Sequence, residues 1–490
     1  MAGFGPALSI LWSIGLVQLL SGCMLTAETP ELGVAIPAAY REDGRAPYAA
    51  TPTAQWWKGF RSRELTGFIA EAEAGNFDIR AAVGRILQAD AQARAAGAPL
   101  LPSIDLHGDA TRSRSSKTLS SSSGAAGTAT TTSASSAPSE RVSYSASLSA
   151  SYEIDFWGKN LATLQAAESS AVASRYDHDV VRLTAIASVA NTYFQVLAAQ
   201  DRLNVARRNA ESADRILELI RQRLQVGTAS ALDVAQQESV LAQQRAAVPE
   251  LEQALRQSTN SLALLLGRTP ESFRVRGGSM SQIRIPRVTP GLPSDLLLRR
   301  PDIAEAEAQL AAANANVYAA RAAFFPSITL TGEGGYESRA LNMLFRPESA
   351  FYTVAAGLVQ PIFDGGRLQG NLDLERGRQA ELLELYRKSI VSGFTDVDNA
   401  LVAVRQTARR EQLQRDVVNS SRRAFQLSET RLREGTIDLV TLLSTQQSLF
   451  QAEDGLAQAR LAHLQAIVGL FQVLGGGWEN PAVVTTANAS

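Results

Sequence analysis

The sequence predicts an α+β membrane protein in which several copies pool β-strands into one barrel, and in which very long α-helices pack on one another. Three observations carry this prediction. Residues 142–156 alternate apolar and polar side chains without a break. Two long segments, from Gly158 to Gly227 and from Gly365 to Gly435, contain no proline. The second half of the chain also repeats the pattern of the first.

The overall composition narrows the classes of function. The 490 residues include 47 basic and 48 acidic side chains, so the chain is nearly neutral and neither nucleic acid nor another polyanion is predicted as a partner. Three histidines and four methionines are too few to indicate a dedicated metal site. We find no catalytic constellation in the sequence, and we expect neither an enzyme nor a bound cofactor.

An export signal is predicted at the N-terminus. Residues 4–20 form an apolar run without charge, followed by Ser-Gly and Cys23. A run of this length at the N-terminus is typical of a signal peptide rather than of a spanning helix. The ending Leu-Ser-Gly-Cys resembles the lipobox of bacterial lipoproteins, in which cleavage precedes the cysteine and its sulfur carries a diacylglycerol. We therefore expect residues 1–22 to be a lipoprotein signal peptide and Cys23 to carry a diacylglycerol and an acyl chain.

The alternative is an ordinary signal peptide with an incidental cysteine. The residue after the cysteine is Met24, whereas aspartate at that position is the usual signal for retention in the inner membrane. The outer membrane is therefore the expected location.

The two halves of the chain match each other at intervals. Asp78 matches Asp302 at an offset of 224 residues, but Gly227 matches Gly435 at an offset of only 208. The first half therefore has extra residues, and they fall in the Ser/Thr/Ala/Gly-rich tract 113–139. Such a tract cannot bury a core, so we expect it to form a long loop on the cell exterior.

The stretch 142–156 is predicted to be a β-strand with one apolar and one polar face. Val142, Tyr144 and the other even-numbered residues up to Phe156 are apolar. The odd-numbered residues are serines, followed by Glu153 and Asp155, and alternate residues of a strand point to opposite faces. We interpret the two carboxylates as pore lining rather than as acid/base partners.

Three further strands complete two hairpins, one in each half. Ile104 and Leu106 share a face in the first strand, and Ile328 and Leu330 share a face in the third. The fourth strand alternates less cleanly, and Pro361 must lie at its end or edge.

Four strands cannot close on themselves, because the smallest membrane barrels have about eight. An open sheet edge is also unstable in lipid. The chain is therefore expected to be an obligate oligomer in which the apolar face meets lipid and the polar face lines a water-filled pore. A soluble β-sandwich is the alternative, but two hairpins that alternate with very long helices do not build one.

Each proline-free segment is predicted to be one long helix. About 66 residues at about 1.5 Å each give a rod of roughly 100 Å. Each rod ends at a Gly-Thr pair, Gly227-Thr228 and Gly435-Thr436, where glycine can cap the helix and let the chain reverse. The returning helices show steps of three and four residues between apolar positions, which specify helix-on-helix packing. His463 occupies one of these seam positions, and packing is its predicted role.

Four further motifs join the lipobox and the Gly-Thr turns: LLLRRPDI at 296–303, FPSITL at 325–330, PIFDGGR at 361–367 and LGGGW at 474–478. Together these six motifs resemble those of TolC-type outer-membrane efflux proteins, most of all the lipidated NodT/OprM branch that serves resistance-nodulation-division pumps. The resemblance covers nearly the whole chain after the signal.

The resemblance implies a homotrimer whose twelve pooled strands form one barrel, continued by a coiled-coil tunnel across the periplasm. It implies the following segments: a lipid anchor with an N-terminal equatorial segment (23–60), a first repeat (61–267, with a β-hairpin at 100–156 and a helix pair at 160–267), an equatorial linker (268–300), a second repeat (301–474, with a β-hairpin at 326–363 and a helix pair at 367–474) and a C-terminal equatorial tail (475–490).

The implied function is that of a passive outer-membrane channel in a tripartite efflux system. An inner-membrane resistance-nodulation-division pump supplies the energy, and a periplasmic adaptor (membrane fusion) protein joins pump and channel. Two alternatives stay open: a type I protein-secretion duct, and a lipid-anchored coiled-coil scaffold without a pore. The sequence does not identify the exported compound.

The resemblance also places a candidate aperture at the periplasmic tips. In TolC-type channels an aspartate nine residues after the second turn glycine rings the aperture, but this chain has Ser444 there. Arg431, four residues before that glycine, matches a position that is often basic and helps to hold the tip closed. Because a latch between a serine and Arg431 cannot be charge-assisted, Asp233 and Asp438 are the nearest remaining acidic candidates.

Overall fold

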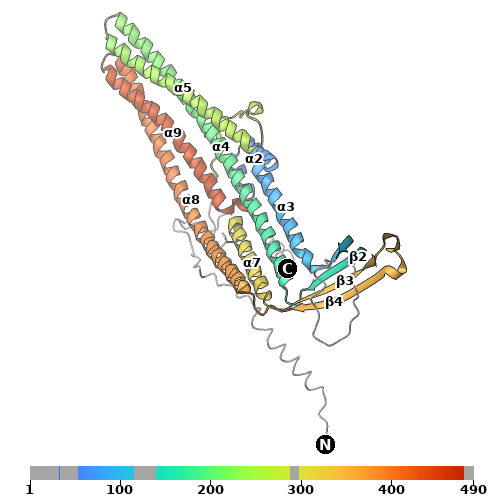
Figure 1. The fold of residues 1–490 in the computed structure, drawn as a ribbon. Coiled ribbons are helices and arrows are strands. Elements are labelled where there is room, and N and C mark those ends of the chain that lie inside the picture. Colours follow the sequence, from blue (N-terminus) through green and yellow to red (C-terminus); the bar gives the residue numbers. More distant parts are fainter. Residues whose placement is uncertain (1–32, 34–52, 115–139, 287–296, 479–490) are drawn as a thin grey trace, which may run out of the picture. The chain divides into compact units, whose positions relative to one another are not determined.

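A computed structural model describes residues 33, 53–114, 140–286 and 297–478. Cys23 and nearly all of the tract 113–139 lie outside the described residues. The elements of the first half are α2 (Arg63–Gly75), α3 (Phe77–Gly97), β1 (Ser103–Arg114), β2 (Glu140–Ile154), α4 (Lys159–Gln225) and α5 (Ala231–Leu265). Those of the second half are α7 (Pro301–Ala322), β3 (Ser327–Ser338), β4 (Ala350–Val359), α8 (Arg367–Arg433) and α9 (Leu439–Val473) (Figure 1).

The chain divides into two compact units. The first contains the four strands and the helix ends that adjoin them, within residues 89–171 and 310–382. The second contains most of the helical residues, within 31–88, 172–309 and 383–490.

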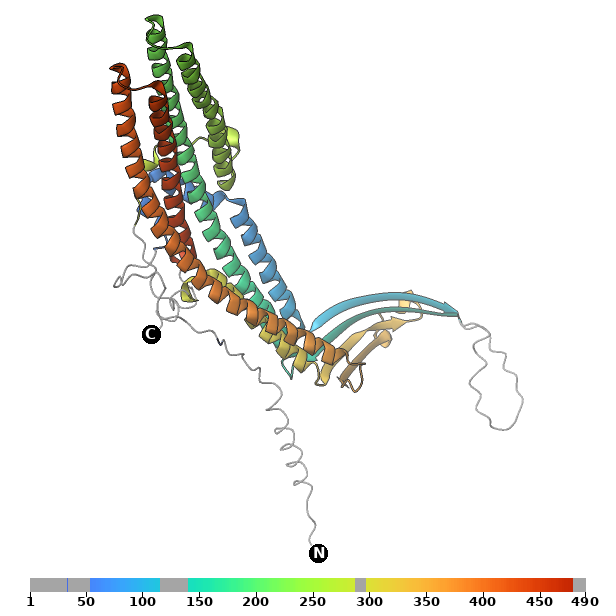
Figure 2. The same ribbon diagram turned by 90° about the vertical axis from the view of Figure 1, so that its left-hand side faces the viewer.

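The strands form one antiparallel sheet in the order β1-β2-β3-β4. Each half contributes one hairpin, and the hairpins join because β2 pairs with β3, from Tyr144 opposite Ser338 to Ile154 opposite Ile328. Figure 2 shows the strands side by side. The apolar face is bare, with Leu106 exposed by 79% and Tyr352 by 84%. An apolar face and two unpaired edges, β1 and β4, leave this sheet incomplete as a monomer.

The two longest helices have the predicted length. α4 and α8 each contain 67 residues, which corresponds to roughly 100 Å. α5 and α9 each contain 35 residues, and α5 runs through Pro249 as a single helix. Each long helix and its shorter partner form an antiparallel helical hairpin (Figure 2).

Aromatic side chains from distant parts of the sequence form the core of the helical unit. Trp56, in the short helix Trp56–Phe60, stacks on Phe471 of α9 with ring centroids 4.8 Å apart. Phe60 packs on Phe194 of α4 at 5.1 Å. These rings are buried, so this core ties the N-terminal segment to helices from both halves.

The linker between the halves is bound to the helical unit through its backbone. Glu64 of α2 accepts hydrogen bonds from the amides of Arg276 and Gly277. Asp201 of α4 accepts one from the Met280 amide at 2.9 Å. These carboxylates satisfy amides that a non-regular segment would otherwise leave unpaired.

Two of the sequence motifs are in direct contact. Arg300 donates to both oxygens of Asp302, to Asp396 of α8 and to the carbonyl of Val473, at 2.6–3.3 Å. Gly475 has a φ of +81°, and a Cβ there would lie only 2.0 Å from the carbonyl oxygen of Arg299. The RRPDI and LGGGW segments therefore form one packed junction, which requires glycine at position 475.

Candidate pore wall and hairpin tips

The polar face of the sheet carries a row of acidic and hydroxyl side chains. Asp105 of β1 lies opposite Ser149 of β2, Ser149 opposite Glu333 of β3, and Glu333 opposite Thr353 of β4. Residues directly opposite in antiparallel strands project from the same face. The row therefore crosses the whole sheet, with two carboxylates per chain.

A second acidic row lies nearer the end of the sheet. Asp109 is opposite Ser145, and Ser145 is opposite Glu337. Between the rows, His107 Nε2 lies 3.0 Å from the hydroxyl of Ser149. Within the described strands, the positions that share this face include one arginine, Arg141. The face is therefore acidic as well as polar.

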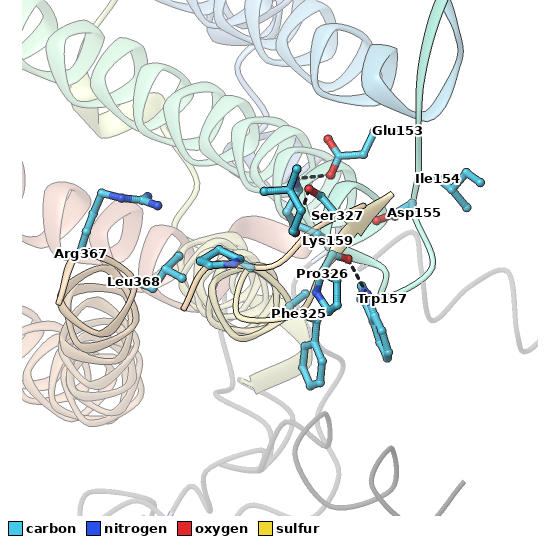
Figure 3. A pocket seen from close by; sticks show the side chains of 14 residues that line it. Glu153, Ile154, Asp155, Trp157, Lys159, Phe325, Pro326, Ser327, Arg367 and Leu368 are labelled. Carbon is cyan, nitrogen blue, oxygen red and sulfur yellow. Dashed lines mark hydrogen bonds and ion pairs between the residues drawn. The ribbon is translucent and has the colours of Figure 1, made fainter. Parts of the chain in front are cut away.

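The end of β2, the start of α4 and the residues just before β3 form a compact junction. Trp157 stacks on Phe325 with ring centroids 4.6 Å apart, and its Nε1 donates to the Pro326 carbonyl at 2.9 Å. Beside this stack lies a cavity of about 200 Å³ that Glu153 and Lys159 also line (Figure 3).

The two carboxylates predicted to line a pore have other roles at this junction. Glu153 forms an ion pair with Lys159 at 2.7 Å. β2 ends at Ile154, so Asp155 lies beyond the strand. Asp155 accepts hydrogen bonds from the amides of Asn160 and Leu161, at 3.0 and 2.7 Å. The strand assignment of Asp155 was wrong because its carboxylate satisfies free amides at the start of α4.

The turn between α4 and α5 has the predicted glycine cap. Gly227 has a φ of +76°, and both the amide and the hydroxyl of Thr228 donate to the carbonyl of Arg223, at 2.8 and 3.1 Å. Ser230 and Asp233 then form a capping box at the start of α5. The pair therefore ends one helix while the serine and aspartate begin the next.

The turn between α8 and α9 repeats this arrangement. Gly435 has a φ of +73°, and the amide and hydroxyl of Thr436 donate to the carbonyl of Arg431, at 2.9 and 3.1 Å. Asp438 caps α9 by accepting from the Thr441 amide at 2.9 Å. Hydrogen bonds from Thr441 lower the pKa of Asp438 below its usual value.

The four candidate aperture residues do not meet within one chain. Ser444 and Arg431 are exposed, while Asp233 and Asp438 serve as helix caps. Among the residues that the structure describes, no hydrogen bond or ion pair joins any two of these four. Within the part of the chain that the structure describes, the four residues therefore form no latch with one another.

The sequence patterns did not predict a contact that joins the two tips, the turn between α4 and α5 and the turn between α8 and α9. Arg223 of the first tip donates to the carbonyl of Leu432 in the second at 2.7 Å. Leu432 belongs to an apolar cluster with Ile216 and Ile220 of α4 and Leu442 of α9. Arg223 lies four residues before Gly227, as Arg431 lies four before Gly435, so the repeat itself could have identified it.

The sequence patterns also did not predict a buried charged cluster around Glu411. His463 is buried in the helix seam, as expected, but its Nδ1 lies 2.6 Å from Glu411 Oε2, so packing is not its sole role. Arg460 donates to Glu411 at 2.9 Å and to the linker carbonyls of Met280 and Ile283. Burial alone would raise the pKa of Glu411, but hydrogen bonds from His463 and Arg415 and the charge of Arg460 lower it to about 2.

The sequence matches one family over most of its length. The sequence model of the family described as "Outer membrane efflux protein" matches residues 68–268 and 292–476. The pyoverdine export outer membrane protein OpmQ of Pseudomonas putida is 42% identical over 456 residues, covering 93% of this chain and 94% of that protein. The toluene efflux pump outer membrane protein TtgF of Pseudomonas putida is 34% identical over 479 residues, covering 96% and 97%.

Solved structures show the same fold. A membrane protein from Pseudomonas aeruginosa superposes with a TM-score of 0.82 at 30% identity, covering 92% of this chain and all of that one. The open state of the Neisseria gonorrhoeae MtrE outer membrane channel gives a TM-score of 0.81 at 27% identity, covering 93% and 98%.

Proposed function

The chain belongs to the outer membrane efflux protein family, and from that premise we propose that it passively conducts small molecules from an inner-membrane pump and a periplasmic adaptor to the cell exterior. It is an outer-membrane efflux channel with a β-barrel and a helical tunnel, like its structural neighbours. The observation that carries the conduction proposal is the row of acidic and hydroxyl side chains that crosses one face of the sheet from Asp105 to Thr353, with an apolar face behind it.

We infer the stoichiometry from the structural neighbours together with the open edges of the sheet. The structural neighbours are trimeric channels, and three copies of the four-stranded sheet supply twelve strands. Pairing of β4 with β1 of the next copy removes both open edges, which is what a lipid environment requires. We propose a homotrimer of this kind, which works with a resistance-nodulation-division pump and its adaptor.

The names of the relatives suggest the class of substrate. Two relatives at 42% and 41% identity are pyoverdine exporters, and another at 34% identity serves toluene efflux. We propose that this chain likewise exports small organic compounds, with siderophore-like molecules as the first class to test. The names of these relatives give no support to the protein-secretion alternative. The proposed function is passive conduction and includes no catalytic step.

The decisive experiment is conductance of the purified protein in planar lipid bilayers. We expect discrete ohmic channels, and deletion of the gene should raise the intracellular level of an exported compound. A purified, folded trimer that conducts no ions under any applied voltage would instead support the scaffold alternative.

The lipid anchor gives a separate prediction, based on the sequence because Cys23 lies outside the described residues. We expect Cys23→Ala to abolish labelling by radioactive palmitate and to slow arrival at the outer membrane. Trimers should still form, because one acyl anchor binds only weakly and the barrel provides firm insertion. Wild-type protein that takes up no label would refute the lipoprotein interpretation.

The tip sequence gives a prediction about ion selectivity. We expect Ser444→Asp to increase cation selectivity and block by multivalent cations, because three converging carboxylates favour cations in a narrow pore. Reversal potentials in a salt gradient measure this directly. Ser239→Asp, an exposed position on α5, is the matched control and should change little. If Ser444→Asp leaves the reversal potential unchanged, Ser444 does not line the aperture.

A further inference from the structure

The apolar face of the sheet ends in arginines. Arg112 and Arg114 lie at the end of β1, on the same face as Leu106, because alternate residues of a strand share a face. Arg112 forms an ion pair with Glu140 at 2.9 Å and its side chain is still 71% exposed. Among the described residues, no ion pair involves Arg114.

The loop between β3 and β4 adds an apolar cluster at the same end of the sheet. Leu341, Met343 and Phe345 are exposed by 63%, 43% and 73%. Phe345 packs edge-on against Tyr336, with ring centroids 5.7 Å apart. Tyr336 shares a face with the apolar residue Leu330 of β3, so the loop continues the apolar face of the sheet.

Two more arginines flank this cluster. Arg339 precedes it and Arg346 follows it, and both are exposed. Within the described part of the chain, neither has an ion-pair partner. The loop contains one carboxylate, Glu348, so its net charge is positive.

Charge is therefore distributed unevenly between the two faces of the sheet, with Glu140 opposite Arg114 on the apolar face and Arg141 on the polar face. The polar face carries Asp105, Asp109, Glu333 and Glu337, whereas the arginines gather where the apolar face ends. These arginines lie at the end of the apolar face, so they do not line the pore. Exposed apolar side chains between them are unfavourable in water. Apolar side chains next to guanidinium groups match the boundary between acyl chains and anionic headgroups.

We propose that this outer rim, formed by Arg112, Arg114, Arg339 and Arg346 with Leu341, Met343 and Phe345, binds phosphate-bearing lipid headgroups at the outer surface of the membrane. The planar guanidinium group recognises phosphate through two parallel hydrogen bonds, and the three apolar side chains contact the adjoining acyl chains. The inference rests on insertion of the barrel in the membrane, but not on the compound that the channel exports.

The test is binding of lipid A, a phosphorylated glycolipid, to the delipidated full-length trimer, measured by native mass spectrometry. We expect lipid A to bind in preference to the zwitterionic lipid phosphatidylcholine. Arg339→Gln/Arg346→Gln should weaken lipid A binding about 30-fold, since each arginine near an anionic lipid surface contributes about 1 kcal/mol. Arg112→Gln/Arg114→Gln should have an effect in the same direction.

Arg141→Gln is the matched control, because Arg141 lies at the same end of the sheet but on its polar face, and it should bind lipid A like the wild type. Leu341→Ser/Phe345→Ser should also weaken binding, which a site for free phosphate would not predict. All variants should retain trimer mobility and bilayer conductance, which separates this test from that of the channel function. Equal lipid A affinity in the arginine variants and the wild type, or displacement of lipid A by inorganic phosphate, would overturn the proposal.

Discussion

Replacing Glu411 by glutamine is expected to destabilise the helical unit by about 3 kcal/mol, a large effect for one amide substitution. Glu411 and His463 are buried, and Arg460 and Arg415 both bond the same carboxylate. Removal of its charge leaves two guanidinium groups facing a neutral amide. Breaking a buried ion pair from one side leaves an uncompensated charge, which is why the effect exceeds that of an exposed pair.

Loss of the Glu411 charge is also expected to affect the linker between the two halves. Arg460 also holds the carbonyls of Met280 and Ile283, which belong to the linker between the two halves. A displaced Arg460 would leave these carbonyls unpaired and loosen the linker from α9. We therefore expect the variant to show faster proteolysis within the linker, in addition to a lower denaturant midpoint by circular dichroism.

The pH dependence of stability provides an independent readout. The pKa of Glu411 is about 2 in the folded protein, against an ordinary value of 4.5. A depressed pKa stabilises the fold above the unfolded value, and the stabilisation is lost as pH falls through the folded value. Wild-type stability should therefore drop by about 3 kcal/mol between about pH 4.5 and pH 2 from this group. Glu411→Gln should lack this drop.

Glu429→Gln is the matched control on the same helix. Glu429 pairs with Arg433 at the surface, where the arginine side chain is 63% exposed. Exposed pairs contribute about 0 to 1 kcal/mol, so this variant should unfold close to the wild type. Equal stability of Glu411→Gln and Glu429→Gln would mean that the buried cluster does not bear on the fold.

The elements that could be predicted from the sequence are those fixed by local pattern. The alternation of 142–156 specified a strand and its apolar face, and the Gly-Thr pairs specified both tips. In each case the physical cause lies within a few neighbouring residues, such as the positive φ of Gly227 and Gly435. The wrong strand assignment of Asp155 has the same origin. The alternation of apolar and polar residues continues past Ile154, where β2 ends, so it does not mark where the strand stops and the cap of α4 begins.

Contacts between distant elements could not be predicted in the same way. The seam position of His463 indicated burial, but not that Glu411, 52 residues earlier, would face it. Nor did the sequence indicate that Arg300 would bind the end of α9, or that Asp201 would hold the linker. Such pairs depend on the rotation and offset of whole helices, which a heptad pattern does not fix.

The acidic row of the sheet leads to the second prediction with a large effect. In a trimer, two carboxylates per chain, Asp105 and Glu333, place six in one layer of the barrel. They face water in a confined space with low-dielectric walls, where charges of one sign concentrate counter-ions on the order of tenfold or more. We expect Asp105→Asn/Glu333→Gln to reduce the cation-to-anion permeability ratio by about that factor, measured from reversal potentials in a salt gradient.

Glu140→Gln/Glu348→Gln removes the same number of charges from other parts of the same unit, and the reversal potential of this control should stay near that of the wild type. The effect of the pore variant should shrink in concentrated salt, because the Debye length falls from about 10 Å at 0.1 M to about 3 Å at 1 M. It should be opposite in sign to the effect of Ser444→Asp, because the pore variant removes carboxylates and Ser444→Asp adds one. A pore variant with wild-type selectivity at low salt would mean that the polar face of the sheet does not line the conducting path.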